Sequence, residues 1–289
     1  MKLFSWIPSS LATWTYTVLF KPRFLRITLQ RIICLFIPEK IAIDGVTLAL
    51  NPKDAVVSGS LAMGFYEKSN IQLFAELFGR NGKGSTFMDI GANIGLYSAL
   101  AAKYTGPTGK VIAVEPDETN CHYIQKTASL NLFSNIDVHL IAAGDYDGEA
   151  KLYINDLNKA DHRLYDNANE RPSKTIRIAQ IDTLIAQTYG NSPIDFIKID
   201  TQGFEYRVLK GMKRTFENNP HVKVVMEFWP WGIVQAGDKP AELLKLIQGY
   251  GLKIKRLDED SAMIHEISGL NTILSLTKER QHVDLFLER

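Results

Sequence analysis

The sequence predicts an α/β fold with a mostly parallel sheet covered by helices on both faces. Short β-branched runs alternate with segments of helical periodicity, which is the pattern of such sheets. The run FMDIGANIGLYSALAA (87–102) joins an apolar strand to a helix through a turn that holds two glycines. That helix is expected to end before Gly106-Pro107, since this pair breaks helices.

The individual elements follow in order along the chain. Strands are predicted near residues 86–90, 111–115, 136–143, 194–200, 222–228, 252–257 and 283–287, and helices near 94–103, 117–130, 203–213 and 239–249. Ahead of the sheet, residues 41–50 resemble a hairpin and residues 70–79 a helix. Two inserted strands, 150–154 and 174–181, flank a polar loop at 155–173.

Composition excludes several classes of protein. The chain has 289 residues, of which 45% are apolar and 22% charged, as in ordinary globular proteins. A formal net charge of only +1 argues against nucleic-acid binding by the whole domain. The two cysteines, Cys34 and Cys121, imply no disulfide framework, and no metal-ligand spacing is visible. These features favour a cytoplasmic protein without a metal site.

Residues 1–40 differ from the remainder. Six basic residues against one glutamate give this segment +5, which leaves −4 for residues 41–289. We therefore divide the chain into a basic, apolar, helical extension (1–40) and a main domain (41–289). Three interpretations of the extension stay open: packing on the main domain or on a second subunit in a homo-oligomer, peripheral contact with the inner face of a membrane, or a spanning helix.

The glycine turn predicts a ligand site. In open parallel sheets, ligands bind beyond the carboxyl ends of the strands. Gly91 would let the backbone approach a ligand where a Cβ would collide, and Gly95 would keep the helix close to the strand. The amides at the start of that helix favour a carboxylate, and Asp89 at the strand end suits an ammonium group.

Glu115 ends the next strand, 20 residues beyond Gly95. A carboxylate at that place can accept both hydroxyl protons of a ribose. Asn93 stands where dinucleotide-binding turns prefer glycine, so the spacing favours S-adenosylmethionine over a nicotinamide cofactor. A nicotinamide-dependent oxidoreductase and a non-catalytic nucleotide-binding module remain the alternatives.

A third element, IDFIKIDTQGFEYRVLKG (194–211), places polar groups at the end of another strand. Asp200 ends this strand, and Gly203 opens a helix that carries Glu205. These groups would face the reactive side of the ligand, although Asp200 and Thr201 could instead satisfy the helix amides.

With these motifs, and with MGFYEKSN (63–70) upstream, residues 45–289 resemble the FkbM-type family of class I S-adenosylmethionine-dependent methyltransferases. The resemblance implies a Rossmann-like sheet of seven strands with the last one antiparallel, and methyl transfer, usually to an alcohol oxygen. Acceptors in the family include sugars, glycans and natural products. We therefore expect an O-methyltransferase acting on a carbohydrate or glycolipid hydroxyl. Gln202 departs from the family pattern, in which many members have glutamate, so it cannot serve as a base.

The expected cofactor-binding residues are Asp89, Gly91, Ala92, Asn93, Gly95, Glu115, Ala143, Asp200 and, from the family pattern, Glu67 beside Tyr66. A sugar hydroxyl becomes a good nucleophile only as its proton leaves, so a general base is expected. The candidates are Asp200, Glu205, Glu227 and His162.

Other polar and aromatic side chains have weaker assignments. Arg163 could hold an anionic acceptor, or it could belong to a solvated loop together with His162. Trp229 and Trp231 could stack on a sugar, although core packing is the more ordinary use. The remaining histidines form no cluster in the sequence and are treated as structural.

Overall fold

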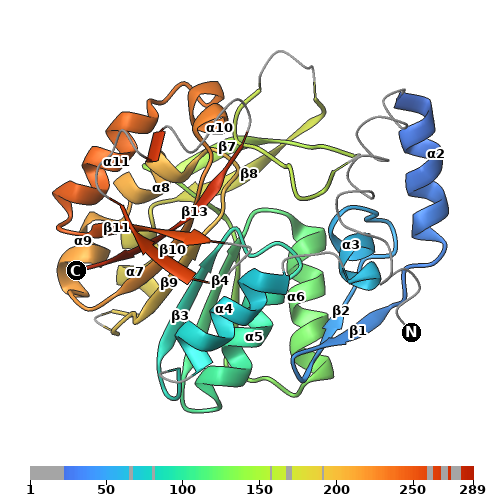
Figure 1. The fold of residues 1–289 in the computed structure, drawn as a ribbon, viewed down its shortest axis with the longest axis horizontal. Helices are drawn as coiled ribbons and strands as arrows, with labels where there is room; N and C mark the ends of the chain where they lie inside the picture. The colour runs from blue at the N-terminus through green and yellow to red at the C-terminus, as the bar shows by residue number, and fades with distance from the viewer. Residues whose placement is uncertain are drawn as a thin grey trace.

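The computed structural model describes residues 23–64, 68–79, 82–156, 158–166, 171–190, 192–258, 263–267, 273–274 and 281–289. Within these residues, the main sheet has eight strands in the order β12-β11-β13-β10-β9-β3-β4-β5 (Figure 1). The strands are β3 (Thr86–Ile90), β4 (Lys110–Glu115), β5 (Ile136–Leu140), β9 (Phe196–Ile199), β10 (Lys223–Phe228), β11 (Lys253–Asp258), β12 (Met263–Glu266) and β13 (Val283–Glu288). β5, β4, β3, β9 and β10 are parallel, whereas β13 is antiparallel to both β10 and β11.

The predicted fold class is confirmed, but the expected strand number of seven is wrong. The additional strand, β12, forms an antiparallel hairpin with β11 at the edge of the sheet. Its four residues are mostly exposed, so they lack the alternation of apolar and polar residues that marks a half-buried strand. Lys255 reaches Glu266 at 2.8 Å across this hairpin.

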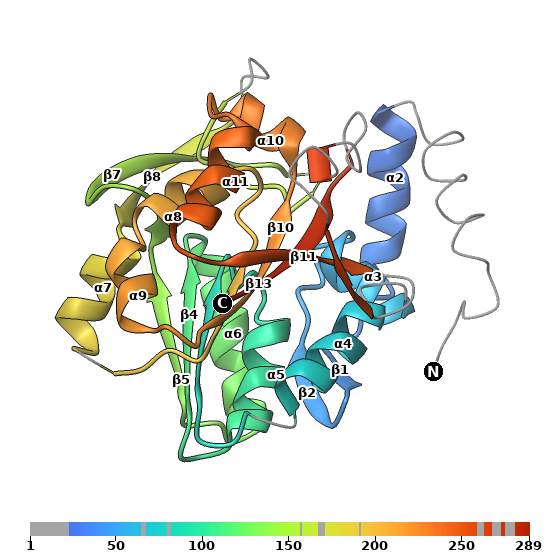
Figure 2. The ribbon, with the colours of Figure 1, turned by 60° about the vertical axis from the view of Figure 1, so that its left-hand side comes forward.

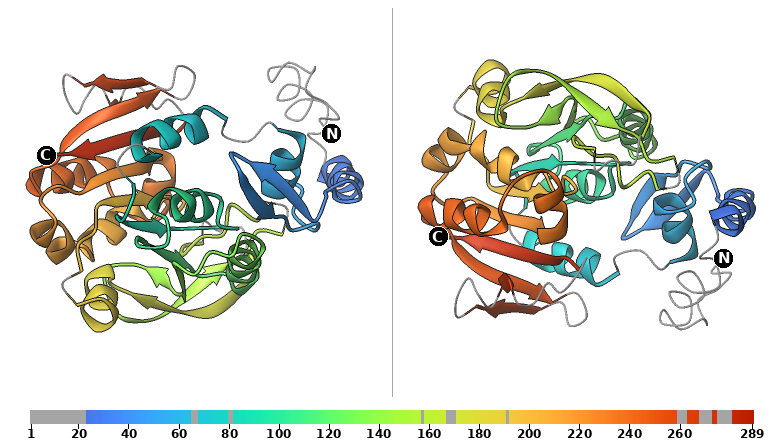
Figure 3. Two further views of the ribbon diagram at one scale, coloured as in Figure 1. Left: turned by 90° about the horizontal axis from the view of Figure 1, so that it is seen from below. Right: turned by 90° about the horizontal axis from the view of Figure 1, so that it is seen from above.

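Helices cover both faces of the sheet (Figure 3). On one face, α4 (Lys68–Gly79), α5 (Leu96–Thr105) and α6 (Glu118–Leu130) pack on the strands. The other face carries α7 (Ile181–Thr188), α8 (Glu205–Lys210), α9 (Lys213–Asn218), α10 (Pro230–Gln235) and α11 (Pro240–Gly249). Because β3 is followed by β4 on one side and β9 by β10 on the other, the order in which strands are added to the sheet reverses between β3 and β9. Ligand sites of open α/β sheets lie at such a reversal.

The predicted strand at 136–143 is divided in two. β5 ends at Leu140, and β6 (Ala142–Ala143) leaves the main sheet to pair with β8 (Ser173–Ala179). β8 also pairs with β7 (Gly148–Tyr153), which gives a three-stranded sheet in the order β6-β8-β7. This small sheet holds the described part of the polar loop (154–156, 158–166 and 171–172) at the carboxyl end of the main sheet, where Tyr153 bridges to Arg163.

The N-terminal elements lie together beside the main sheet (Figures 1 and 2). They are α2 (Arg23–Cys34), the hairpin of β1 (Lys40–Ile43) and β2 (Val46–Ala49), and α3 (Val57–Met63). α2 packs closely on α3, since a Cβ on Gly59 would lie 2.9 Å from Ile33. Among the described residues, no helix has the length and apolar character needed to cross a membrane.

Candidate active site

The glycine turn after β3 has a backbone that favours glycine at two positions. Gly91 (φ +80°) and Gly95 (φ +86°) lie in the left-handed region, and so does Asn93 (φ +52°). A Cβ on Gly91 would lie 1.9 Å from the carbonyl oxygen of Asp200, and one on Gly95 would lie 2.8 Å from Ile124. We expected Gly91 to let the backbone approach a ligand. The structure shows another reason for glycine here: a side chain would collide with the turn after β9.

Glu115 binds the glycine turn directly. Its Oε2 accepts the amide of Asn93 at 2.8 Å, and its Oε1 accepts the amide of Asp117 at 3.0 Å and Nδ2 of Asn120 at 3.1 Å. Burial raises the pKa of Glu115 to about 7, although the three N–H donors favour its ionised form. The carboxylate is thus held rigidly at the end of β4, 5% exposed.

A cavity of about 300 Å³ opens at the carboxyl ends of β3, β4 and β9. Its walls include the glycine turn, Glu115, an apolar strip and the polar loop: Gly91, Ala92, Asn93, Ile94, Glu115, Ile141, Ala142, Ala143, Leu152, Lys159, His162, Asp200, Gln202, Glu227 and His282. The first turn of α5, with Leu96 and Tyr97, completes one wall and brings the positive end of that helix to the cavity. Sequence motifs far apart in the chain therefore meet in one pocket of ligand size.

Two of the expected cofactor contacts, Asp89 and Gly95, are not among the residues that line the cavity. Asp89 is 1% exposed beneath the glycine turn and is not among the lining residues; its Oδ2 accepts the hydroxyl of Ser98 at 2.6 Å. Burial raises the pKa of Asp89, and its Oδ1 has no hydrogen-bond partner. Asp89 therefore stabilises the structure beneath the glycine turn through its hydrogen bond with Ser98. Glu67 and Tyr66 lie outside the described residues.

Asp200, Gln202 and Glu227 form a polar network at the cavity wall. The side-chain amide of Gln202 donates to Oδ1 of Asp200 at 2.9 Å and to Oε2 of Glu227 at 3.3 Å, while Lys198 contacts Oδ2 of Asp200 at 3.1 Å. Burial acts to raise the pKa of Asp200, but Lys198 and Gln202 hold it below its ordinary value. Burial and the nearby carboxylate of Asp200 raise the pKa of Glu227 well above its ordinary value. The two shifts therefore favour the ionised form of Asp200 and the protonated form of Glu227.

Glu205, a candidate base, is not among the residues that line the cavity. Its side chain is fully buried, and Oε1 accepts the amides of Thr201 and Gly203, each at 3.0 Å, and the Thr201 hydroxyl at 3.1 Å. Burial raises the pKa of Glu205 to about 7. These contacts show that Glu205 stabilises the turn after β9, and its position outside the cavity argues against a role in proton transfer.

His162 lines the cavity, but its ring orientation is unsuited to a base. The backbone amide of Asn155 donates to its Nδ1 at 3.1 Å, so the neutral ring carries its proton on Nε2. Burial lowers the pKa of His162, which keeps the ring neutral. His162 can therefore donate a hydrogen bond into the cavity.

The alternatives for Arg163 and the tryptophans are decided by packing. Arg163 is 7% exposed and ion-paired with Asp161, which Arg171 also contacts at 2.9 Å. The Arg163 guanidinium stacks at 4.9 Å on Trp229 and 5.5 Å on Trp231. None of these three side chains is among those lining the cavity, so neither an anion-binding Arg163 nor sugar stacking by the tryptophans is supported.

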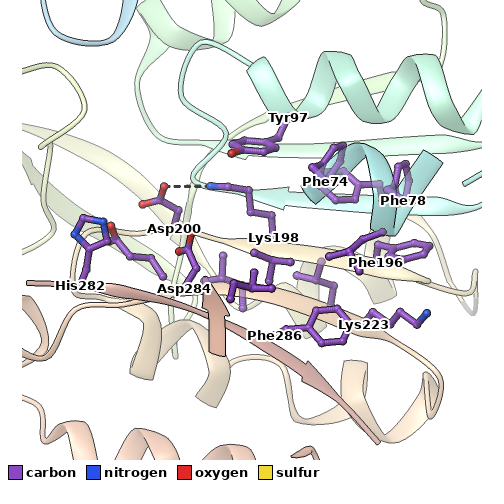
Figure 4. A pocket seen from close by; sticks show the side chains of 17 residues that line it. Phe74, Phe78, Tyr97, Phe196, Lys198, Asp200, Lys223, His282, Asp284 and Phe286 are labelled. Atoms are coloured by element: carbon purple, nitrogen blue, oxygen red, sulfur yellow. Dashed lines mark hydrogen bonds and ion pairs between the residues drawn. The ribbon is translucent and has the colours of Figure 1, made fainter. Parts of the chain in front are cut away.

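The structure also places two residues at the cavity that the sequence patterns missed. Lys198 points from β9 toward Asp200 and lies 4.8 Å above the ring of Tyr97 (Figure 4). His282 immediately precedes β13 and lines the same cavity. A lysine within an apolar strand signals a functional face, but nothing in the sequence distinguishes His282 from the other histidines.

The cavity thus lies where the strand order reverses between β3 and β9, which is where open α/β sheets bind their ligands. The sequence profile of the Methyltransferase FkbM domain matches residues 89–254, more than half of the chain. This chain therefore belongs to the FkbM methyltransferase family and is an S-adenosylmethionine-dependent methyltransferase. A search of curated proteins finds no match.

Solved structures with a similar fold are distant in sequence. The methyltransferase FkbM from Methylobacillus flagellatus KT is 18% identical with a TM-score of 0.44; the match covers 95% of this chain and 60% of that one. Aeropyrum pernix fibrillarin, solved with bound S-adenosyl-L-methionine, is 14% identical over 76% of this chain and 75% of its own, with a TM-score of 0.44. The M. jannaschii TYW2 structure with AdoMet is 16% identical over 86% and 85%, with a TM-score of 0.41.

The residues of the cavity fit S-adenosylmethionine. Glu115 presents a rigid carboxylate suited to ribose hydroxyls, and Ile141, Ala142 and Ala143 offer an apolar strip suited to a base. Asp200 supplies a negative charge that suits a cationic ligand. The family match sets aside the nicotinamide alternative.

Proposed function

We propose that this protein transfers the methyl group to a hydroxyl oxygen of a carbohydrate-bearing acceptor. When bound, S-adenosylmethionine supplies a methyl group already activated by its sulfonium. The protein must then align the acceptor and take up its proton, and alignment of this kind contributes up to ~7–11 kcal/mol.

One observation carries the proposal: Asp200 lies at the cavity wall together with Glu227 and His282, and Lys198 and Gln202 both contact its carboxylate. In this arrangement, Asp200 accepts the hydrogen bond of the acceptor hydroxyl and orients its oxygen. Gln202 fixes the Asp200 carboxylate through its Oδ1. We assign the removal of the proton to Asp200, either directly or through the adjacent imidazole of His282.

Methyl transfer from labelled S-adenosylmethionine to a panel of glycans and alkyl glycosides tests this function. Formation of a methyl ether is expected on a hydroxyl of at least one acceptor. Transfer only to amines or carboxylates would contradict the proposal. Binding of S-adenosylhomocysteine without any transfer would favour the non-catalytic alternative.

We further propose that the protein is cytoplasmic and contacts the inner face of a membrane through α2. Ile32 (49% exposed), Leu35 (80%) and Phe36 (73%) form an apolar surface at the end of this helix, within the basic segment 1–40. Such a surface suits an interfacial helix.

Replacing Leu35 and Phe36 with serine is expected to reduce cosedimentation with anionic vesicles, whereas Leu132→Ser, at another exposed leucine, should not. A parent protein that ignores vesicles but self-associates would favour the homo-oligomer instead.

A further inference from the structure

A second cavity, of about 120 Å³, lies between α4 and the strands β9, β10 and β13 (Figure 4). The middle part of its wall is apolar and largely aromatic: Phe74, Phe78, Phe196, Val225, Leu257 and Phe286. Phe78 and Phe196 meet edge to face with their ring centroids 4.5 Å apart. The cavity therefore has a rigid aromatic wall.

Polarity varies along this face of the sheet. At the carboxyl end, Glu227 of β10 pairs in register with Asp284 of β13. Two residues further back, Val225 pairs with Phe286, and on its other side Val225 pairs with Lys198. Several charged groups thus stand at the carboxyl end of the cavity and aromatic side chains lie behind them. Lys223 lies at the far end, with its ammonium nitrogen 5.9 Å from the ring centroid of Phe196, as Figure 4 shows.

The opposite face of the same strands lacks any such change. Val224, Met226 and Leu285, which alternate with the residues just named, are all fully buried in the main core. A sheet face that served only for packing would be apolar throughout. The mixed face therefore suits a ligand whose polar head lies at Asp200 and Glu227 and whose apolar part lies among the aromatic side chains.

The second cavity joins the cofactor cavity at its polar end. Five residues line both: Tyr97, Lys198, Asp200, Glu227 and His282. A molecule held in the aromatic part of the second cavity would present its head at Asp200 and Glu227, which is where the acceptor oxygen must lie.

We propose that the second cavity binds the apolar part of the methyl acceptor, which is an alcohol that carries a hydrocarbon chain. This inference rests on the proposed function and narrows it: the acceptor is amphipathic, and its hydrocarbon part lies against Phe74, Phe196 and Phe286. A small free sugar would leave this part of the site unfilled and would bind weakly.

Linear alcohols test the inference, because they carry only a hydroxyl and a chain. The full-length protein is saturated with S-adenosylhomocysteine and titrated with 1-butanol, 1-hexanol and 1-octanol by ligand-observed NMR. Affinity should rise roughly three- to fourfold for each methylene that enters the cavity. Val225→Phe fills the cavity and should abolish this dependence, and Leu257→Phe does the same from another strand. Val234→Phe adds the same volume at a residue that is 55% exposed and should behave as the parent.

The outcomes separate this inference from the proposed function. Affinity for S-adenosylhomocysteine, measured first, shows that each variant is folded. If the parent binds S-adenosylhomocysteine but its affinity for the alcohols does not depend on their chain length, the inference is wrong and the proposed function is unaffected. The inference is also wrong if both cavity-filling variants keep the dependence of the parent. A parent that fails to bind S-adenosylhomocysteine would overturn the proposed function itself.

Discussion

The backbone amide of Asn93 donates a hydrogen bond of 2.8 Å to Oε2 of Glu115. This contact joins the turn after β3 to the end of β4, together with the amides of Gly91 and Ala92, which donate to the carbonyl oxygen of Val114 at 2.9 and 3.2 Å. It positions the carboxylate and the turn relative to each other before any ligand arrives. Preorganisation of this kind reduces the cost of ordering the site on binding.

The close approach of two turns predicts a large effect of Gly91→Ala. The new Cβ would meet the carbonyl oxygen of Asp200 at 1.9 Å, in addition to the strain of φ +80°. Gly237→Ala is the matched control, since Gly237 has φ +86° and nothing within 4 Å of a Cβ. The control should lose roughly 1–2 kcal/mol of unfolding free energy from φ alone, and Gly91→Ala clearly more. Equal losses in chemical denaturation would contradict this interpretation.

Burial of Glu205 predicts a pH-dependent stability. Its pKa is raised from 4.5 to about 7 in the folded protein. A raised pKa contributes stability that is fully present below about 4.5 and is lost as the pH rises through 7. Glu205→Gln keeps the acceptor oxygen and removes this loss, so the stability of the variant relative to the parent should improve by about 3 kcal/mol between pH 5 and pH 8.

Urea unfolding of both proteins at the two pH values measures this difference. Glu149→Gln, at an exposed residue of β7, should show no such change. A relative stability of Glu205→Gln that is constant with pH would exclude a perturbed carboxyl at this position.

The bridging amide predicts that Gln202→Glu is destabilising at high pH. The substitution replaces the donor to Asp200 and Glu227 with a third carboxylate. We expect a loss of roughly 1–3 kcal/mol at pH 8, and recovery near pH 5, where the added carboxyl can hold a proton. Thermal unfolding across this range provides the measurement; a loss independent of pH would show that shape, and not charge, is what Gln202 provides.

Of the three candidate bases that line the cavity, Asp200 and His162 should respond differently to substitution. Asp200→Asn should lower kcat by roughly 10²–10⁴-fold if Asp200 takes up the proton. His162→Gln should lower it much less, since Nδ1 of His162 already accepts the amide of Asn155. Single-turnover assays with S-adenosylmethionine and an active acceptor compare them. The reverse order of effects would transfer the role of base to His162.

The sequence predicted those parts of the site that depend on local pattern. The glycine turn, Glu115 and Asp200 each follow a recognisable strand, and parallel strands bring their carboxyl ends to one edge. Pattern could not show that Glu205 turns back onto the amides of Thr201 and Gly203, because that depends on tertiary packing.

Other features lay beyond local pattern for different reasons. β12 is too short and too exposed to show a strand period, and β6 leaves the main sheet because of its pairing with β8. The role of His282 arises only when β13 inserts between β10 and β11, far from β3 and β4 in sequence. Long-range pairing of this kind determines which isolated polar residue becomes part of a site.

Calorimetric titration of S-adenosylhomocysteine tests the central claim, that Glu115 and the glycine turn form the cofactor site. The parent protein should bind, and Glu115→Gln should bind at least tenfold more weakly. The amide of the variant has no charge, and its NH2 group would lie against N–H donors, either that of Asn93 or those of Asp117 and Asn120. Glu149→Gln should bind as the parent does. Equal affinity of the parent and Glu115→Gln, or no binding by the parent, would contradict the account.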